Sequence, residues 1–288
     1  MALTTSCPWL GWLAGLCSRY AIWCREGGDK LNPVHRLLIT GAAGTVGGML
    51  RDGLRALADE LRLLDTRRLE PRPGEEVMEG DIADLSVARR AVAGCDACVH
   101  LAGIPVEAPF DQILHGNIEG TWAVFEAARL EGCPRIVFAS SNHATGFHRV
   151  GDATGPDSPL RPDTYYGVSK VFGEALGRMY HDKFGLRVAC LRIGSALERP
   201  LERRHLSTWL SPGDLNRLVA ACLSSPDLGF AIVYGASANT RGWWDLESGR
   251  RLGYAPQDDS EAFAEEVTDR PVGEFQGGPK FTDPGTTP

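Results

Sequence analysis

The sequence predicts an α/β protein built on a doubly wound parallel sheet, and three observations support this fold class. Short apolar runs alternate with longer helix-like stretches, which is the rhythm of repeated βαβ units. A glycine-rich turn follows the first apolar run. Candidate catalytic and binding residues come directly after the apolar runs, at the strand ends where parallel sheets bind their ligands. The candidate strands are 36–40, 61–65, 97–102, 135–139, 187–193 and 231–234, and the candidate helices are 45–58, 84–93, 117–131 and 165–184.

The first candidate strand ends in the turn Gly41-Ala42-Ala43-Gly44-Thr45-Val46-Gly47, and a helix-like stretch follows it. Gly41 permits a tight turn, and Gly47 allows the helix to pack closely on the strand. Gly44 allows a pyrophosphate to approach the backbone N–H groups at the helix N-terminus. We therefore expect Gly41, Gly44, Thr45, Val46 and Gly47 to bind a dinucleotide.

An acidic residue closes the second candidate strand. Asp65 lies 24 positions after Gly41, where a carboxylate can bind both hydroxyls of the adenosine ribose. The same carboxylate would repel a 2′-phosphate, so the sequence predicts NAD as the cofactor. Arg67 and Arg68 follow at once and could soften that preference.

Tyr166 and Lys170 stand four positions apart, so they share one face of the helix predicted at 165–184. A fixed ammonium group favours the phenolate form of a neighbouring tyrosine and is expected to lower its pKa by several units. The pair could thus act as a base near neutral pH. The alternative is an ordinary amphipathic helix with a solvated lysine.

Composition excludes several classes of function. The net charge of −7 provides no broad basic field, so we expect no nucleic-acid partner. The eight cysteines form no disulfide framework, and the CxxC pair Cys95 and Cys98 lacks a second pair to complete a zinc site. We interpret them as reduced core thiols, which implies the cytoplasm. His143 and His148 lack further ligands, so we expect no metal.

The N-terminal residues fit nothing downstream. The apolar segment 8–17 is too short to span a bilayer and has no preceding Lys or Arg, so we expect no membrane partner. We expect residues 1–34 to be a disordered or dispensable extension. Residues 35–288 would then form a single domain, with a small substrate region mainly within 195–288.

The chain resembles the extended short-chain dehydrogenases/reductases, which have a Rossmann-type fold, over residues 36 to about 282. More narrowly, it resembles the NAD-dependent uronate dehydrogenases. The segments that carry this resemblance are Phe138–His143, Tyr166–Lys170, Arg192–Ser195, Leu206–Trp209, Gly235–Asn239, Gly242–Asp245 and Phe275–Gly278. The resemblance implies oxidation of D-galacturonate or D-glucuronate at C1 to the aldarolactone, with reduction of NAD, in a homo-oligomer.

The resemblance also implies the catalytic roles. Ser141, 25 positions before Tyr166, would bind the reacting hydroxyl, and Tyr166 would remove its proton while C1 passes hydride to the nicotinamide. Lys170 would tune the tyrosine and hold the nicotinamide ribose. Because Ser141 is neutral, it can orient the substrate without opposing the phenolate. The alternative for Ser141 is a hydroxyl that caps the end of a strand.

A uronate carries a carboxylate, which requires a cation or several donors in a partly dry pocket. The resemblance places Arg204 there, and a guanidinium suits this task better than a lysine. Arg199 and Arg203 lie nearby, so the alternative is a solvated basic loop. Asn142 and His143 are expected to bind sugar hydroxyls, and Ser195 is expected to touch the substrate.

The remaining expected cofactor contacts follow other strands: Asp81 and Ile82 beside the adenine, and Leu101, Ala102, Gly103 and Ile193 along the cleft. Asn117 would sit behind the active site. The chain departs from the family at Pro105, where a serine commonly contacts the substrate. Proline has neither a hydroxyl nor an N–H, so one sugar contact is in doubt.

Three other functions are possible for a chain with the same cofactor-binding segments. One alternative is an NAD-dependent sugar epimerase or reductase of the same family; a nucleotide-sugar epimerase, however, needs room for a diphosphate sugar, and only 93 residues follow Ser195 to form it. A 4,6-dehydratase would want acidic residues beside the active-site serine, where this chain has Asn142-His143. A non-catalytic dinucleotide-binding protein is the last alternative. Such a protein would usually have lost the catalytic base, whereas this chain keeps Ser141, Tyr166 and Lys170.

Overall fold

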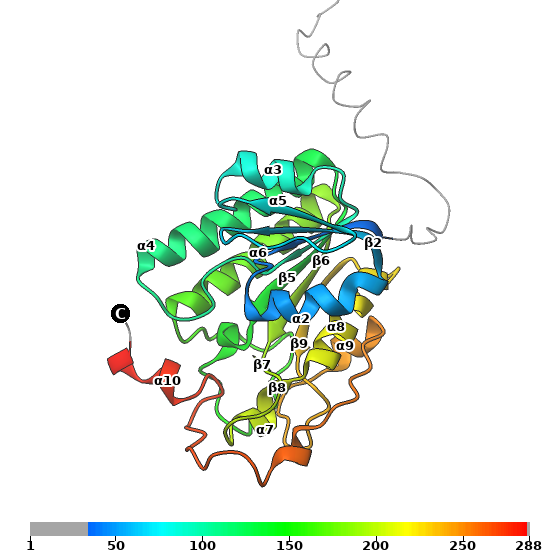
Figure 1. Cartoon of the computed structure of the whole chain (residues 1–288). Coiled ribbons are helices and arrows are strands. Elements are labelled where there is room, and N and C mark those ends of the chain that lie inside the picture. The colour runs from blue at the N-terminus through cyan, green and yellow to red at the C-terminus, as the bar shows by residue number, and fades with distance from the viewer. Residues whose placement is uncertain (1–33, 287–288) are drawn as a thin grey trace, which may run out of the picture. The chain divides into compact units, whose positions relative to one another are not determined.

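A parallel sheet of seven strands forms the centre of the computed structural model, which describes residues 34–286 (Figure 1). The strand order is β3-β2-β1-β4-β5-β6-β9, and every neighbouring pair is parallel. The chain therefore winds outward from β1 to β3, crosses back to β4, and winds outward again. This confirms the doubly wound fold. The strands are Val34–Thr40 (β1), Ala58–Asp65 (β2), Glu75–Glu79 (β3), Ala97–His100 (β4), Arg135–Ser141 (β5), Arg187–Ile193 (β6) and Phe230–Gly235 (β9).

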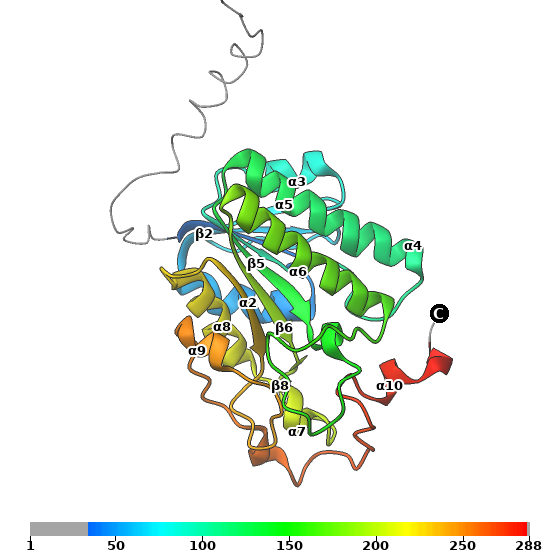
Figure 2. The ribbon, with the colours of Figure 1, turned by 180° about the vertical axis from the view of Figure 1, so that it is seen from behind.

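Helices cover both faces of the sheet (Figures 1 and 2). Helices α2 (Thr45–Gly53) and α8 (Pro212–Ser224) pack together on one face, and α3 (Leu85–Val92), α5 (Gly120–Glu131) and α6 (Tyr165–Phe184) lie on the other. Each face of the sheet has its own hydrophobic core, and alternate side chains of β1 pack into the two cores. Leu37 and Ile39 lie in one core, and Leu38 lies in the other. Short elements complete the fold: α4 (Phe110–Ile113), β7 (Ser195–Ala196), α7 (His205–Thr208), β8 (Trp209–Leu210), α9 (Glu247–Arg251) and α10 (Pro279–Thr282).

Several element boundaries differ from the expectation. The helix expected over 45–58 ends at Gly53, because β2 already begins at Ala58. The expected helix 117–131 begins with a π-helical turn, Leu114–Glu119, before α5. The expected strand 97–102 ends at His100. Strand β3 was not predicted, because its sequence Glu-Glu-Val-Met-Glu is typical of a charged edge rather than an apolar run.

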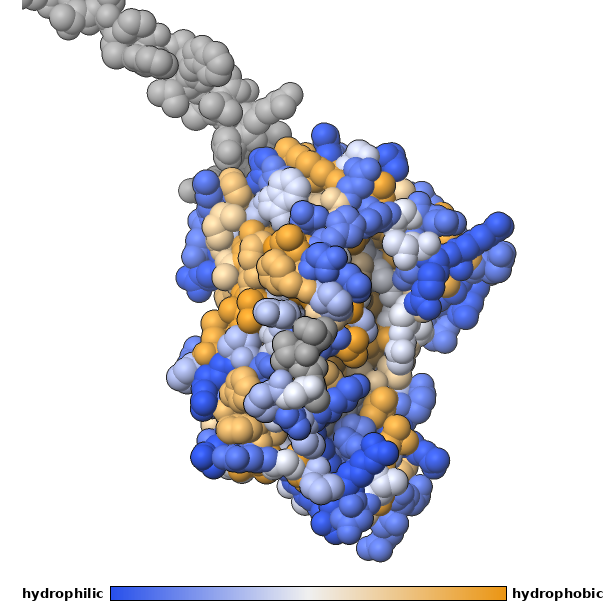
Figure 3. Space-filling model, turned by 90° about the vertical axis from the view of Figure 1, so that its left-hand side faces the viewer, coloured by the Kyte–Doolittle hydropathy of each residue, from blue (hydrophilic) through white to orange (hydrophobic). Residues whose placement is uncertain are grey.

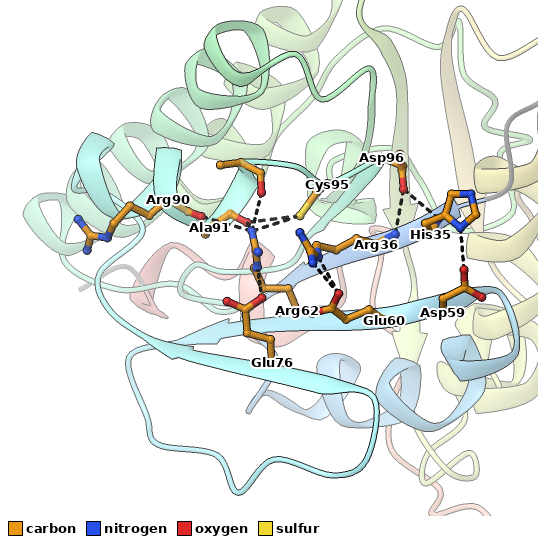
Figure 4. Close-up of polar contacts among 11 residues, drawn as sticks. His35, Arg36, Asp59, Glu60, Arg62, Glu76, Arg90, Ala91, Cys95 and Asp96 are labelled. Atoms are coloured by element: carbon orange, nitrogen blue, oxygen red, sulfur yellow. Dashed lines mark hydrogen bonds and ion pairs between the residues drawn. The ribbon is translucent and has the colours of Figure 1, made fainter.

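A buried arginine ties β2 and β3 to the end of α3 (Figure 4). Arg62 pairs with Glu76 at 2.8 Å and donates hydrogen bonds to the carbonyl oxygens of Ala91 and Ala93 at 2.9 and 2.7 Å. These carbonyls lie at the C-terminal end of α3, where a cation is favourable. The contacts fix the half of the sheet that leads to Asp65.

The cysteines of the described residues are free and buried. Burial raises the pKa of Cys95 to about 11 and that of Cys133 to about 12, so these thiols stay protonated. Cys95 and Cys98 are therefore core thiols, as predicted. Within residues 34–286 no group of acidic, histidine or cysteine side chains could hold a metal, and no helix is long and apolar enough to cross a membrane.

Candidate functional site

Two cavities of about 770 and 620 Å³ adjoin at the carboxyl ends of the strands. They share Val46, Leu101, Gly103, Ile104 and Pro105 as lining residues, so they form one elongated cleft. The smaller cavity contains the glycine turn, and the larger contains the tyrosine and lysine. This shape suits an extended dinucleotide with a substrate at one end.

The glycine turn has the geometry that a dinucleotide requires. Gly41 has φ +69°, and a Cβ there would lie 2.7 Å from the backbone nitrogen of Ala102. A Cβ at Gly47 would lie 2.5 Å from the Gly41 carbonyl oxygen. Gly44 is the N-cap of α2 and supplies no side-chain cap, so the first N–H groups of the helix remain open to a phosphate. These residues fit the pyrophosphate of NAD.

Asp65 is held rigidly at the end of β2. Its two carboxylate oxygens accept hydrogen bonds from the backbone N–H groups of Ala43 and Arg67, both at 2.9 Å. The side chain lines the smaller cavity, where a ribose hydroxyl can donate to its remaining lone pairs. The side chains of Arg67 and Arg68 are 65% and 80% exposed, although Arg67 also lines this cavity, with its Nε 3.5 Å from Asp65 Oδ1.

Asp81 and Ile82 line the same cavity, as expected for neighbours of the adenine. The sequence reasoning missed His115, which also lines it and lies 2.7 Å from Asp81 through Nε2. The backbone N–H of Ala83 and this histidine lower the pKa of Asp81, so the carboxylate stays charged.

The start of α6 places Tyr166 in the larger cavity. Thr164 caps the helix by accepting a hydrogen bond from the Gly167 N–H at 2.9 Å. Glu107, from the loop after β4, accepts from the N–H groups of Tyr165 and Tyr166 at 3.2 and 3.1 Å. Sequence reasoning missed Glu107, because it lies 59 positions from Tyr166. The helix end that carries the tyrosine is thus held from two sides.

Asn117 lies behind this helix turn, where it was expected. Its side chain bonds to both backbone groups of Ile104, at 2.7 and 3.1 Å, and donates to Ser169 Oγ at 3.0 Å. Ser169 donates in turn to the Tyr166 carbonyl oxygen at 2.7 Å. The π-helical turn that carries Asn117 therefore joins the loop at Ile104 to the first turn of α6.

The electrostatics of Tyr166 differ from the expectation. Burial raises the pKa of Tyr166 to about 12, and a hydrogen bond with Ser141 offsets only part of this rise. Lys170 does not lower it: its Nζ lies 5.4 Å from the Tyr166 ring centroid and 5.1 Å from that of Phe138. Burial lowers the pKa of Lys170 itself to about 8. The predicted drop in the tyrosine pKa is therefore wrong for this structure, because desolvation is the largest effect on the phenol.

Ser141 ends β5 beside the tyrosine. Its Oγ accepts a hydrogen bond from the backbone N–H of His143 at 3.2 Å, and its hydroxyl also bonds with the Tyr166 side chain. Ser141 caps a short helical turn, Asn142–Thr145, and also lies beside Tyr166; its expected role in binding the reacting hydroxyl stays a prediction.

Arg204 projects into the larger cavity as a charged group without an acidic partner among residues 34–286. Its Nε and Nη2 donate to the Gln276 carbonyl oxygen at 3.0 and 2.7 Å, and its Nη1 lies 3.4 Å from Ser195 Oγ. Burial lowers its pKa to about 10, so it remains protonated at neutral pH. By contrast, Arg199 and Arg203 pair with acidic residues at the surface.

Asn142, His143 and Ser195 line the same cavity as Arg204. The Asn142 amide fits its neighbours when its oxygen accepts from Arg204 Nη2 and its nitrogen donates to the Ile193 carbonyl oxygen, both at 3.1 Å. The structure thus brings the predicted substrate residues together around one guanidinium. Pro105 lines both cavities, so the position where this chain has proline and the family commonly has serine lies within the cleft.

The sequence reasoning gave no role to Gln276, which anchors the C-terminal side of the cavity. Its side-chain nitrogen donates to the carbonyl oxygens of Arg149 and Asp152 and to Thr154 Oγ1 at 2.8–3.1 Å. Its side-chain oxygen accepts from Trp244 Nε1 at 2.9 Å. The segments Gly242–Asp245 and Phe275–Gly278, quoted above only for their resemblance, therefore meet in the structure.

A buried ion pair supports the cavity from below. Glu174, one turn after Lys170, pairs with Arg192 through two 2.9 Å bonds and accepts from Ser140 Oγ at 2.6 Å. The guanidinium and carboxylate are 1% and 4% exposed. The network joins α6 to the ends of β5 and β6, which carry Ser141 and Ile193.

Comparisons with known proteins agree with this geometry. Residues 37–204 match the model of the NAD dependent epimerase/dehydratase family. The uronate dehydrogenase of Pseudomonas syringae pv. tomato is 45% identical over 83% of this chain and 88% of its own length. The crystal structure of uronate dehydrogenase from Agrobacterium tumefaciens superposes with a TM-score of 0.84 at 49% identity, covering 88% of this chain and 98% of that one.

A mutant of the Agrobacterium enzyme complexed with NAD has the same TM-score of 0.84 and 49% identity, covering 86% of this chain and 97% of that one. The likeness thus extends over both the glycine-turn cavity and the tyrosine cavity. The chain belongs to the NAD dependent epimerase/dehydratase family and, within it, to the uronate dehydrogenases.

Proposed function

We propose that this oxidoreductase removes hydride from C1 of D-galacturonate or D-glucuronate and releases the aldarolactone, with NAD as the oxidant. The observation that carries the proposal is Arg204. A partly buried guanidinium that is held, among residues 34–286, only by neutral acceptors and is open to a cavity is a site for an anion, and its planar fork suits a carboxylate. A uronic acid offers that carboxylate on C5, which the ring oxygen joins to C1.

The reacting hydroxyl would lie between Ser141 and Tyr166. When bound, NAD supplies the hydride acceptor and a positively charged nicotinamide ring. Tyr166, its phenolate favoured by the positive charge of the bound nicotinamide, would take the proton from the C1 hydroxyl, and Ser141 would donate a hydrogen bond to the oxygen as it becomes a carbonyl. Lys170 would hold the nicotinamide ribose. Its lowered pKa, about 8, also lets it give up a proton to solvent in mildly alkaline conditions.

The remaining assignments follow from the linings of the cleft. The residues proposed for the cofactor are Gly41, Gly44, Thr45, Val46, Gly47, Asp65, Asp81, Ile82, Leu101, Ala102, Gly103, Tyr166, Lys170 and Ile193. Those proposed for the substrate are Ser141, Asn142, His143, Ser195 and Arg204. Segments 193–205 and 270–281 line the larger cavity, which supports a substrate region mainly within 195–288.

A substrate panel tests the function. Purified protein with NAD is given galacturonate, glucuronate, galactose and a UDP-sugar, and reduced nicotinamide is followed by absorbance. We expect turnover with one or both uronates and little with galactose. Product analysis of the UDP-sugar reaction separates a redox-neutral epimerase. A protein that binds NAD but changes none of these sugars would contradict the proposal and favour a non-catalytic role.

We also propose that residues 1–33, which lie outside the described part, are dispensable for activity. The support is that β1 begins at Val34 and leads directly into the glycine turn. A chain that begins at Val34 should keep its solubility and turnover. Loss of either would contradict this. The free, buried thiols support a further proposal, that the enzyme acts in the cytoplasm.

We propose that the enzyme is a homo-oligomer, with a second copy covering the helices on the α4 side. Apolar side chains there remain about half exposed: Phe110 and Leu114 near α4, Trp122 on α5, and Tyr165, Val168 and Met179 on α6. Figure 3 shows apolar groups among charged ones on the side where α4 lies. Light scattering should report more than one subunit, and Phe110→Asp should lower the subunit number. A monomeric wild type would contradict this proposal.

A further inference from the structure

A histidine and a carboxylate form a buried pair at the edge of the substrate cavity. His143 Nδ1 lies 2.8 and 3.0 Å from the two oxygens of Asp163. The histidine side chain is 10% exposed and the carboxylate is fully buried. A buried carboxylate is costly unless donors surround it, and the Thr164 hydroxyl is its other donor, at 3.1 Å.

The carboxylate occupies a slot made by two glycines from distant segments. A Cβ at either Gly146 or Gly277 would overlap Asp163 Oδ2. The Gly277 N–H donates to the Gly146 carbonyl oxygen at 2.9 Å, which holds the two walls together. The slot therefore exists only because both positions lack side chains. Gly277 belongs to Phe275–Gly278, one of the segments on which the family resemblance rests, and its role is to leave room for the carboxylate.

The imidazole ring is fixed by its neighbours. The Phe281 ring centroid lies 4.3 Å from that of His143, and the Tyr166 ring centroid lies 5.8 Å away. With Nδ1–H donated to Asp163, the neutral ring leaves Nε2 as an acceptor. No residue between 34 and 286 bonds to Nε2, and His143 lines the 770 Å³ cavity.

Two groups around the substrate position, Arg204 and Lys170, are cations that can donate but cannot accept. Glu202, a carboxylate in the same lining, is already paired with Arg270 at 3.7 Å. A sugar hydroxyl, however, has a proton of its own that needs an acceptor in a buried site. A bare imidazole nitrogen supplies such an acceptor.

We propose that Asp163 is a positioning residue, which fixes the tautomer of His143 so that Nε2 accepts a hydrogen bond from a ring hydroxyl of the sugar acid. This inference rests on the proposed function for the identity of the ligand. Asp163 itself does not touch the substrate. The pair would select substrates that present a hydroxyl donor at this point of the ring.

Nitrogen NMR tests the tautomer in the unaltered protein. The full chain is labelled with ¹⁵N-histidine and measured at pH 8 with NAD bound, and His143→Ala assigns the signals. We expect Nδ1 protonated and Nε2 unprotonated in His143. A protonated Nε2, in either the other tautomer or the imidazolium, would overturn the proposal. This measurement does not depend on turnover, so it remains decisive if the enzyme oxidises no uronate.

A double-mutant cycle tests the functional consequence. Asp163→Asn keeps the volume but turns a donor toward Nδ1, which forces the proton onto Nε2. We expect KM for the better uronate to rise about tenfold or more while the dissociation constant for NAD stays unchanged. In a His143→Ala background the same change should alter KM less than about twofold. An equal effect in both backgrounds would mean that Asp163 is only structural.

Glycine variants provide a second approach to the same pair. Gly277→Ala leaves every charge in place but pushes a methyl group into the carboxylate slot, so it should raise KM as Asp163→Asn does. Gly155→Ala is the matched control, because its nearest neighbour would lie at 3.5 Å, an ordinary contact. Unchanged KM in a folded Gly277→Ala enzyme, shown by its melting temperature, would contradict the proposal.

Discussion

Gln276 and Arg204 meet although 72 positions separate them, and the carbonyl oxygen of Gln276 accepts two hydrogen bonds from the guanidinium, at 3.0 and 2.7 Å. A carbonyl oxygen is neutral, so it orients the guanidinium without cancelling its charge. The Gln276 side chain is itself fully bonded, which fixes the carbonyl in place. The charge of Arg204 thus remains available to an anion.

Removing this cation should weaken substrate binding selectively. Arg204→Ala is expected to raise KM for galacturonate about 10²-fold, because a desolvated charge pair is lost. The slow oxidation of galactose should change little, since galactose has no carboxylate. Arg203→Ala is the control, because Arg203 pairs with Asp269 at the surface. Equal losses in the two variants would mean that a general basic field, rather than Arg204, attracts the substrate.

Tyr166→Phe should remove the proton acceptor and almost no volume. We expect kcat to fall about 10³-fold or more, while NAD binding, followed by fluorescence titration, stays within twofold. Retained turnover would show that another group accepts the proton.

Lys170→Met should abolish most of the activity yet stabilise the fold. The pKa of Lys170 falls from 10.5 to about 8 on burial, so the charged form is disfavoured in the folded state. This penalty is fully present below pH 8 and disappears as pH rises from 8 to 10.5, because folded and unfolded chains then both lose the proton. The gain in unfolding free energy should be on the order of 2 kcal/mol below pH 8. Urea unfolding at pH 7 and pH 10 measures the gain in unfolding free energy. An equal gain at both pH values would mean that the buried charge of Lys170 is not its cause.

Two neighbouring glycines should respond differently to an added methyl group. Gly41→Ala would place a Cβ 2.7 Å from the Ala102 nitrogen at a φ of +69°, so it should abolish NAD binding or folding. Gly48→Ala lies in α2 with nothing within 4 Å and should raise the unfolding free energy by up to about 1 kcal/mol. Circular dichroism with NAD titration distinguishes these outcomes. A Gly41→Ala protein with normal NAD affinity would refute the turn geometry.

The buried pair of Glu174 and Arg192 should be far more sensitive than a surface pair. Glu174→Gln leaves a buried guanidinium uncompensated and is expected to cost about 3–5 kcal/mol of unfolding free energy. Glu274→Gln, in the exposed pair with Arg149, should cost less than about 1 kcal/mol. Chemical denaturation of both variants compares them directly. Similar losses would contradict the burial argument.

Much of the fold could be predicted from local sequence, because apolar runs mark buried parallel strands and glycine marks the turn after β1. Strand β3 was not predicted, because the sequence of a charged edge strand contains no apolar run. Helix α8 was also missed, although Ser211 and Pro212 give a recognisable start: the serine caps the helix and the proline occupies its first turn.

The site was predictable wherever residues lie at fixed short spacings, such as Tyr166 and Lys170 on one helix face. The spacing could not give the burial that sets their pKa values, because burial depends on the whole cleft. Gln276 and Asp163 could not be recognised for a similar reason: their partners lie 122–127 and 20 positions away, and only the folded chain brings them together.

The dependence of Arg204 on Gln276 has a consequence for how the protein matures on the ribosome. Everything needed to cradle the nucleotide is synthesised by the time β6 emerges, yet the anchor of the guanidinium is made almost last. The cofactor side of the cleft is thus complete in sequence well before the residue that holds the guanidinium. Shortening the chain before residue 276 would remove the carbonyl that holds Arg204 and leave the glycine turn and Asp65 in the sequence.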